Sequence, residues 1–133
     1  MNRAISEMTG DYLSWLSHDD LYTADKVEKE IRAIESLERA DTIIYSDYAV
    51  FTDDPEQALA IRLQGVPCEQ FRYWITVENQ LHGCTLLIPR AAFDAVGRFD
   101  ESLRTTQAYD LWYRMAARLP FVHLPAGLVK ARS

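Results

Sequence analysis

Apolar residues recur every three or four positions in two segments of the chain, and this spacing predicts amphipathic helices. In the first segment, residues 25–39, the apolar positions are Val27, Ile31, Ile34 and Leu37. The charged side chains between them are expected on the outer face, namely Lys26, Glu30 and Glu38. The second segment, residues 107–118, is expected to turn the following side chains inward: Leu111, Trp112, Met115 and Leu119.

Short runs of apolar and aromatic residues predict buried strands. They lie at residues 12–16, 42–51, 84–89, 121–124 and 128–131, the last two on either side of Pro125. Further helices are expected over residues 67–80 and 90–96, and Gly97 is expected to end the second. Residues 56–66 fit a strand and a helical turn equally well. Strands and helices alternate, so the sequence predicts an α/β fold in which a sheet is flanked by helices.

Length and charge limit the classes of protein to consider. The chain has 133 residues, which fits a single domain over residues 1–133. Its net charge is −6, with 20 acidic and 14 basic residues and no basic run, so no nucleic-acid partner is expected. No apolar run approaches the roughly 20 residues of a membrane span. Cys68 and Cys84 are expected to be reduced and buried, and we expect a cytoplasmic protein, either free or peripheral to a membrane.

Asp19 and Asp20 directly follow the first expected strand and its short polar extension. Ligands of open α/β sheets gather at the carboxyl ends of strands, and paired carboxylates there can hold Mg²⁺ or Mn²⁺ against a diphosphate. The two aspartates are therefore candidate metal ligands. An alternative is that they only place negative charge near the start of the following helix. These two residues by themselves favour neither interpretation.

Two later segments carry polar side chains suited to contact a ligand. His82 and Gly83 lie between a helix and an apolar strand, where Gly83 permits close backbone approach and His82 offers a hydrogen-bond donor. Gln107 begins the last helix, and Tyr109 and Trp112 share one of its faces. Each has a plainer alternative: a half-buried histidine in a turn, and a core role for Trp112, which the apolar spacing of its helix favours.

Five motifs, taken in order, resemble the family 2 glycosyltransferases of the GT-A fold. They are residues 10–20 (GDYLSWLSHDD), 45–48 (YSDY), 82–90 (HGCTLLIPR), 97–103 (GRFDESL) and 107–114 (QAYDLWYR). The first resembles the strand and DxD-type metal motif, and the last resembles the block that ends in YDLWxR. Each motif alone is weakly specific, but the ordered set covers nearly the whole chain.

The resemblance implies a nucleotide-sugar donor, a divalent cation (Mn²⁺ or Mg²⁺), a sugar or lipid-linked acceptor, and inversion at the anomeric carbon. It places Asp19 at the metal and the donor, with Asp20 beside it. On the acceptor side it places these residues: His82, Gly83, Gln107, Tyr109 and Trp112. All of these roles are carried over from the family's motifs and are expectations at this point.

Two departures from the family's pattern affect the chemistry that we expect. Ser17 stands where many members have the first aspartate of the metal motif. In such enzymes an aspartate just before the YDLW block removes the proton of the acceptor hydroxyl, and Ala108 occupies that position here. Asp110 lies two residues further on, on a different helix face, and is a poor substitute. No catalytic base is therefore intact, and we expect weak or no transfer activity.

The family's first nucleotide-binding strands have no counterpart in this sequence, so we expect a partial GT-A fold. The strand at residues 12–16 would then lie at a sheet edge, and exposed edges favour self-association into a homo-oligomer. An alternative function is that of a non-catalytic interaction or oligomerisation protein derived from the glycosyltransferase fold.

Overall fold

A computed structural model describes all residues from 1 to 133. The helices are α1 (Asn2–Ser6), α2 (Lys26–Leu37), α3 (Cys68–Glu78), α4 (Arg90–Val96) and α5 (Gln107–Ala116). The strands are β1 (Tyr12–Leu13), β2 (Leu21–Tyr22), β3 (Ile43–Phe51), β4 (Leu59–Ile61), β5 (Ile88–Pro89) and β6 (Phe121–Arg132). Two 3₁₀ turns complete the chain, η1 (Pro55–Gln57) and η2 (Gly83–Thr85). No helix is both long enough and apolar enough to cross a membrane.

The central sheet is mixed, with strand order β2-β6-β3-β4. Its two long strands, β3 and β6, run parallel, and the short edge strands β2 and β4 pair antiparallel to them. Two strands were predicted on either side of Pro125, but the structure has one continuous strand, β6. Its pairing with β3 shifts register at this point, since Ser46 pairs with Leu124 and Asp47 pairs with Gly127. Pro125 has no N–H to donate, so a bulge is where it can be accommodated within a strand.

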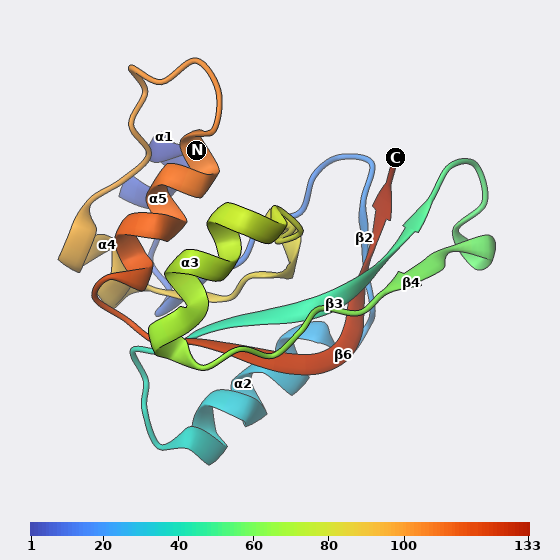
Figure 1. Ribbon diagram of the computed structural model, residues 1–133, viewed down its shortest axis with the longest axis horizontal. Coiled ribbons are helices and arrows are strands. Elements are labelled where there is room, and N and C mark those ends of the chain that lie inside the picture. The colour runs from blue at the N-terminus through green and yellow to red at the C-terminus, as the bar shows by residue number, and fades with distance from the viewer.

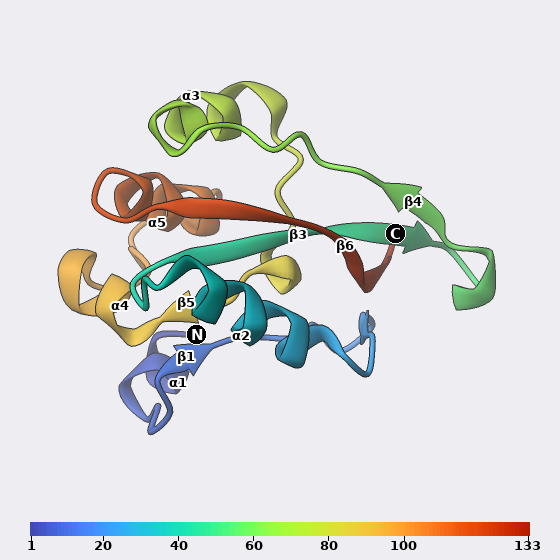
Figure 2. The ribbon, with the colours of Figure 1, turned by 90° about the horizontal axis from the view of Figure 1, so that it is seen from below.

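Helices cover both faces of this sheet, which confirms the α/β architecture predicted from the sequence. In Figures 1 and 2, α3 and α5 lie on one face of β3 and β6, and α2 lies on the other. Successive residues of β3 point to opposite faces. Ile43 and Tyr45 accordingly join the main core beneath α3 and α5, whereas Ile44 packs with Ile34 of α2 in a smaller cluster.

The strand predicted over residues 12–16 is much shorter in the structure. Only Tyr12 and Leu13 form β1, which pairs with β5 in a separate two-stranded sheet. Beyond Leu13 the strand ends, because the Tyr22 side chain binds a backbone carbonyl that a neighbouring strand would otherwise pair with. The Tyr22 hydroxyl donates to the carbonyl oxygen of Trp15 and lies 2.8 Å from Ser14 Oγ. The segment that follows is therefore a loop fixed by side chains.

Helix α2 lies within the predicted segment, but its buried face was predicted incorrectly. Lys26 and Glu30, expected outside, are 1% and 0% exposed, whereas Val27 and Leu37, expected inside, are 49% and 43% exposed. Residues 26, 30 and 34 are four apart and share one face, so Ile34 remains buried with the charged pair. Burial of both charges is possible because Lys26 Nζ lies 2.7 Å from Glu30 Oε1.

The C-terminal half follows the sequence more closely. Helix α4 spans the predicted residues and ends at Gly97, whose positive φ of 84° suits glycine. Helix α5 turns Leu111, Trp112 and Met115 into the core, as the spacing predicted. The apolar run at residues 84–89 is a strand only at its end, since it begins with the 3₁₀ turn η2. Cys84 in that turn is buried as predicted, whereas Cys68, also predicted to be buried, is exposed at the start of α3.

Candidate functional site

Asp19 and Asp20 lie in very different surroundings. Asp19 is exposed in a turn, whereas Asp20 is buried, with 6% of its surface exposed. Asp20 Oδ1 accepts a hydrogen bond from the Arg132 backbone N–H at 2.9 Å, and Oδ2 accepts one from Cys84 Sγ at 3.2 Å. Asp20 thus anchors the turn to β6 and η2, and Asp19 is the carboxylate that faces outward.

This arrangement fits a divalent cation held from one side. A hard cation such as Mg²⁺ or Mn²⁺ binds oxygen ligands and keeps several of its waters, so a single exposed carboxylate can serve together with ligand phosphates. Asp19 meets that requirement. Ser17, at the position where the resemblance predicts the first aspartate of the metal motif, has its hydroxyl 3.5 Å from Cys84 Sγ. Asp20 is better placed to orient the turn than to reach a cation in front of it.

His82 and Gly83 lie against this turn. The His82 ring packs against Tyr48 at a centroid distance of 5.3 Å, and its Nε2 is 3.7 Å from Asp20 Oδ2. A Cβ atom on Gly83 would lie 2.9 Å from the Trp15 ring and 3.3 Å from the Trp112 ring. Only glycine allows the chain to pass between these two indoles, so the segment that precedes the Asp19 turn, η2 and α5 meet at Gly83.

The first turns of α5 hold polar and aromatic side chains in fixed contacts. Gln107 Nε2 donates to the Leu103 carbonyl, and the Tyr109 hydroxyl donates to the Leu81 carbonyl at 3.2 Å. Trp112 is 3% exposed, so its ring faces are covered by protein, and its buried Nε1 has no hydrogen-bond partner. Tyr109 packs on Trp112 at a centroid distance of 4.9 Å and links α5 to the segment before η2.

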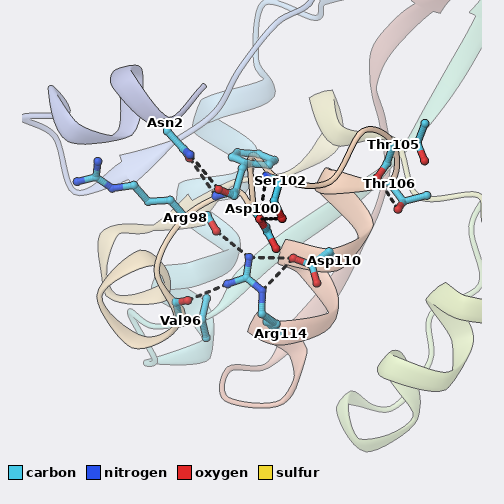
Figure 3. Close-up of polar contacts among 10 residues, drawn as sticks. Asn2, Val96, Arg98, Asp100, Ser102, Thr105, Thr106, Asp110 and Arg114 are labelled. Atoms are coloured by element: carbon cyan, nitrogen blue, oxygen red, sulfur yellow. Dashed lines mark hydrogen bonds and ion pairs between the residues drawn. The ribbon is translucent and has the colours of Figure 1, made fainter.

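Asp110 is engaged by Arg114, one turn further along α5 (Figure 3). Arg114 Nε lies 3.0 Å from Asp110 Oδ2, and the same guanidinium donates to the carbonyl oxygens of Val96 and Arg98 at 2.8 and 2.7 Å. The pair therefore fixes α5 to the loop after α4. Ala108 is half-buried and packs its methyl group on the core, where it supplies no proton acceptor.

Comparison with known proteins identifies the family of the whole chain. The family model described as "Glycosyltransferase like family 2" matches residues 1–133. The chain belongs to this glycosyltransferase family. This confirms the resemblance found in the sequence and assigns a glycosyltransferase-like domain.

Two glycosyltransferase relatives illustrate how much of each protein the chain spans. It is 36% identical over 135 residues to an uncharacterised glycosyltransferase of Rickettsia felis, covering 99% of this chain and 22% of the relative. It is 31% identical to the amylovoran biosynthesis glycosyltransferase AmsB of Erwinia amylovora, covering 85% of this chain and 38% of AmsB. The chain thus spans less than two-fifths of either relative.

A solved structure shows the same fold. TarS of S. aureus, crystallised as residues 1–349 with UDP, superposes with a TM-score of 0.69 at 13% identity, covering 99% of this chain and 38% of TarS. A second TarS structure, with UDP-GlcNAc, gives a TM-score of 0.67. The chain covers 38% and 37% of the two TarS chains, which is consistent with the partial GT-A domain that the sequence predicted.

Within this family member, the sequence did not mark two groups that shape the candidate site. The sequence predicted Cys84 only as the first residue of a buried strand, whereas in the structure its thiol contacts both Ser17 and Asp20. Burial raises the pKa of the Cys84 thiol, so it is held as a neutral donor to the Asp20 carboxylate. The Arg132 backbone N–H is the second group. The only feature of the sequence that could have indicated a role for Cys84 is its place in the motif HGC. No feature of the sequence indicated a role for Arg132.

Proposed function

We propose that this chain forms the cation-binding and acceptor-side part of an inverting glycosyltransferase that uses a nucleotide-sugar donor. Residues 1–133 would act as one unit, with Asp19 presenting its carboxylate to Mn²⁺ or Mg²⁺ and the cation contacting the donor's diphosphate. The observation that carries this proposal is the contrast between the two aspartates. Asp20 is buried and both of its carboxylate oxygens accept hydrogen bonds, whereas Asp19 is exposed in a turn whose neighbours Ser17 and Asp20 contact Cys84 of η2.

The residues of the proposed site divide the work of transfer. A bound cation supplies charge stabilisation for the departing diphosphate. The Asp19 carboxylate would hold the cation in front of the turn, while Asp20 keeps that turn fixed to β6. His82 and Gly83 line the proposed acceptor side, together with Gln107 and Tyr109. Trp112, being buried, would act there by holding Tyr109 and Gly83 in position.

The proposed site has no general base to accept the proton of the acceptor hydroxyl. Ala108 carries no basic group, and the carboxylate of Asp110 is paired with Arg114. Loss of a general base typically slows a reaction by about 10²–10⁴-fold. We therefore propose that the chain binds the donor and transfers its sugar slowly or not at all.

Ala108 also favours a second candidate function, a non-catalytic binding or oligomerisation protein built on the family's fold. In that case the donor site would be lost together with the base, and no nucleotide would bind. The two candidates thus differ in a single measurable property, which is affinity for a nucleoside diphosphate in the presence of Mn²⁺.

Titration calorimetry with UDP, GDP and dTDP, and with their sugars, tests the donor site in the presence of Mn²⁺. We expect heat with at least one nucleotide, at least tenfold weaker binding in Asp19→Asn, and unchanged binding in Asp94→Asn. Asp94 is an exposed aspartate on α4 and serves as the matched control. Absence of heat with every nucleotide would reject donor binding, and equal affinity in Asp19→Asn would reject the role of Asp19.

We further propose that the chain self-associates through the free edge of β1 and resides in the cytoplasm. Strand β1 pairs with β5 on one side only, so its other edge can add a strand from a second copy. The two cysteines are free thiols, which suits a reducing compartment. Light scattering after size-exclusion chromatography should report a multiple of 15.3 kDa, and a monomer at every concentration would refute self-association.

A further inference from the structure

Asp20, His82 and Cys84 bring together three types of metal-ligand atom. One ligand atom from each residue lies within 4.8 Å of the other two. Asp20 Oδ2 is 3.2 Å from Cys84 Sγ and 3.7 Å from His82 Nε2. Asp20 and Cys84 are buried, and the His82 side chain is 31% exposed, so the group is reached from solvent on the histidine's side.

The backbone holds these three side chains in place before any ligand arrives. The Arg132 N–H occupies Asp20 Oδ1, which leaves Oδ2 directed at Cys84. The 3₁₀ turn η2 sets Cys84 two residues after His82, and Thr85 fixes the start of that turn by donating its Oγ1–H to the His82 carbonyl at 2.7 Å. Little conformational freedom would therefore be lost on binding.

We propose that Asp20, His82 and Cys84 form a site for a thiophilic divalent cation of the Zn²⁺ class, with the fourth position open to water. Ligand atoms around a tetrahedral zinc ion, with bonds of about 2.0–2.3 Å, are spaced roughly 3.3–3.6 Å apart. The two spacings from Asp20 Oδ2, 3.2 and 3.7 Å, lie close to that range, and the third pair of ligand atoms, from His82 and Cys84, lies within 4.8 Å. Sulfur and imidazole ligands select such an ion over Mg²⁺ or Mn²⁺, which prefer oxygen.

Binding involves a defined exchange of protons. The Cys84 thiol releases its proton to solvent, and the S–H···O bond to Asp20 is replaced by bonds from sulfur and oxygen to the cation. His82 coordinates through Nε2 and carries its proton on Nδ1. The Cys84 N–H contact to Nδ1, which is long at 3.3 Å, is given up.

This site is distinct from the one proposed at Asp19, and it has a structural consequence. A cation bound by Asp20 and by His82 and Cys84 of the HGC motif links the Asp19 turn directly to η2. The link is independent of nucleotide binding, because Asp19 is not among the ligands. At about 100 times its dissociation constant, a bound ion should raise the melting temperature by roughly 5–10 °C.

Titration of the chain with Co²⁺, a spectroscopic substitute for Zn²⁺, tests the proposal. We expect a sulfur-to-cobalt charge-transfer band that saturates at one equivalent and disappears on addition of Zn²⁺, but not of excess Mg²⁺. Cys68→Ser, which removes the other thiol, should keep the band, and Cys84→Ser should lose it. A chain without the band, or a Cys84→Ser variant that keeps it, would overturn the proposal.

Two further variants keep the test decisive if Cys84→Ser does not fold. His82→Ala removes a half-exposed ligand and should weaken Zn²⁺ binding by about tenfold or more while circular dichroism stays unchanged. Asp19→Asn should leave the cobalt band intact even where it abolishes nucleotide binding. Unchanged Zn²⁺ affinity in a folded His82→Ala variant would likewise refute the site, whatever the outcome of the nucleotide experiments.

Discussion

Ala108 lies in the first turn of α5, at the position where the resemblance to the family's motif predicts the aspartate that accepts the acceptor's proton. Its methyl group is half-buried, and an added carboxylate near a helix N-terminus is favoured by the helix dipole. Ala108→Asp should therefore fold and should raise donor hydrolysis by about 10²-fold or more over the unaltered chain. Ala108→Asn, which has the same shape without basicity, is the matched control. Equal rates in the two variants would show that this position does not hold the base.

Asp110 and Arg114 allow a second prediction about single residues. The ion pair is about one-third exposed, so Asp110→Asn should lower the free energy of unfolding by no more than about 1 kcal/mol. Arg114→Met also deprives the carbonyls of Val96 and Arg98 of their donor and should cost about 2–3 kcal/mol in urea unfolding. Donor hydrolysis by Ala108→Asp should persist when Asp110→Asn is added. If hydrolysis is lost while the fold is kept, Asp110 takes part in the chemistry.

Helix α2 carries the buried ion pair of Lys26 and Glu30, in which Lys26 also donates to Ser14 Oγ at 3.1 Å. Lys26→Met leaves a buried carboxyl without its partner and should cost about 3–5 kcal/mol in urea unfolding near pH 7. The double variant Lys26→Met, Glu30→Leu removes both charges and should recover most of that loss. A double variant as unstable as the single one would show that the pair contributes through packing alone.

The pH dependence of the Lys26→Met variant follows from Glu30. Burial raises the pKa of Glu30, and Lys26 opposes that rise, so removing Lys26 raises the pKa further. A carboxyl whose pKa is higher in the folded state stabilises the fold when protonated, and that contribution is lost as pH rises through the raised pKa. The destabilisation of Lys26→Met relative to the unaltered chain should therefore shrink as the pH is lowered below 7. A penalty that does not change with pH would contradict this assignment.

Elements were predictable from the sequence where local signals agree with packing. Helix α4 has a proline before its first residue and a glycine after its last, and α5 has an uninterrupted apolar face. The buried face of α2 was not predictable, because the spacing of four that places Lys26 and Glu30 inward depends on Ser14 and Tyr22, which precede the helix. Strand β1 ends early for the same reason, since Tyr22 occupies the groups that a neighbouring strand would need.

At the scale of the whole molecule, the motifs predicted that distant segments form one site, but not which side chains contact one another there. The predicted site joins the Asp19 turn, η2 and α5. In the structure Gly83 of η2 lies between Trp15, which precedes that turn, and Trp112 of α5. The roles of Asp19 and Asp20 could not be separated from sequence. The partners that bury Asp20 are Cys84 and Arg132, which lie 64 and 112 positions away along the chain. Such long-range contacts leave no local pattern.

Paramagnetic broadening of amide signals by Mn²⁺ in the presence of a nucleoside diphosphate tests the central claim most directly. If Asp19 holds the cation in front of η2 and α5, the amides of Asp19, His82 and Gly83 should broaden first, followed by Gln107. The amide of Glu69, in the first turn of α3 and at the opposite end of that helix from His82, should stay sharp, and Asp19→Asn should abolish the pattern. Broadening centred elsewhere, or absent at His82 and Gly83, would contradict the account.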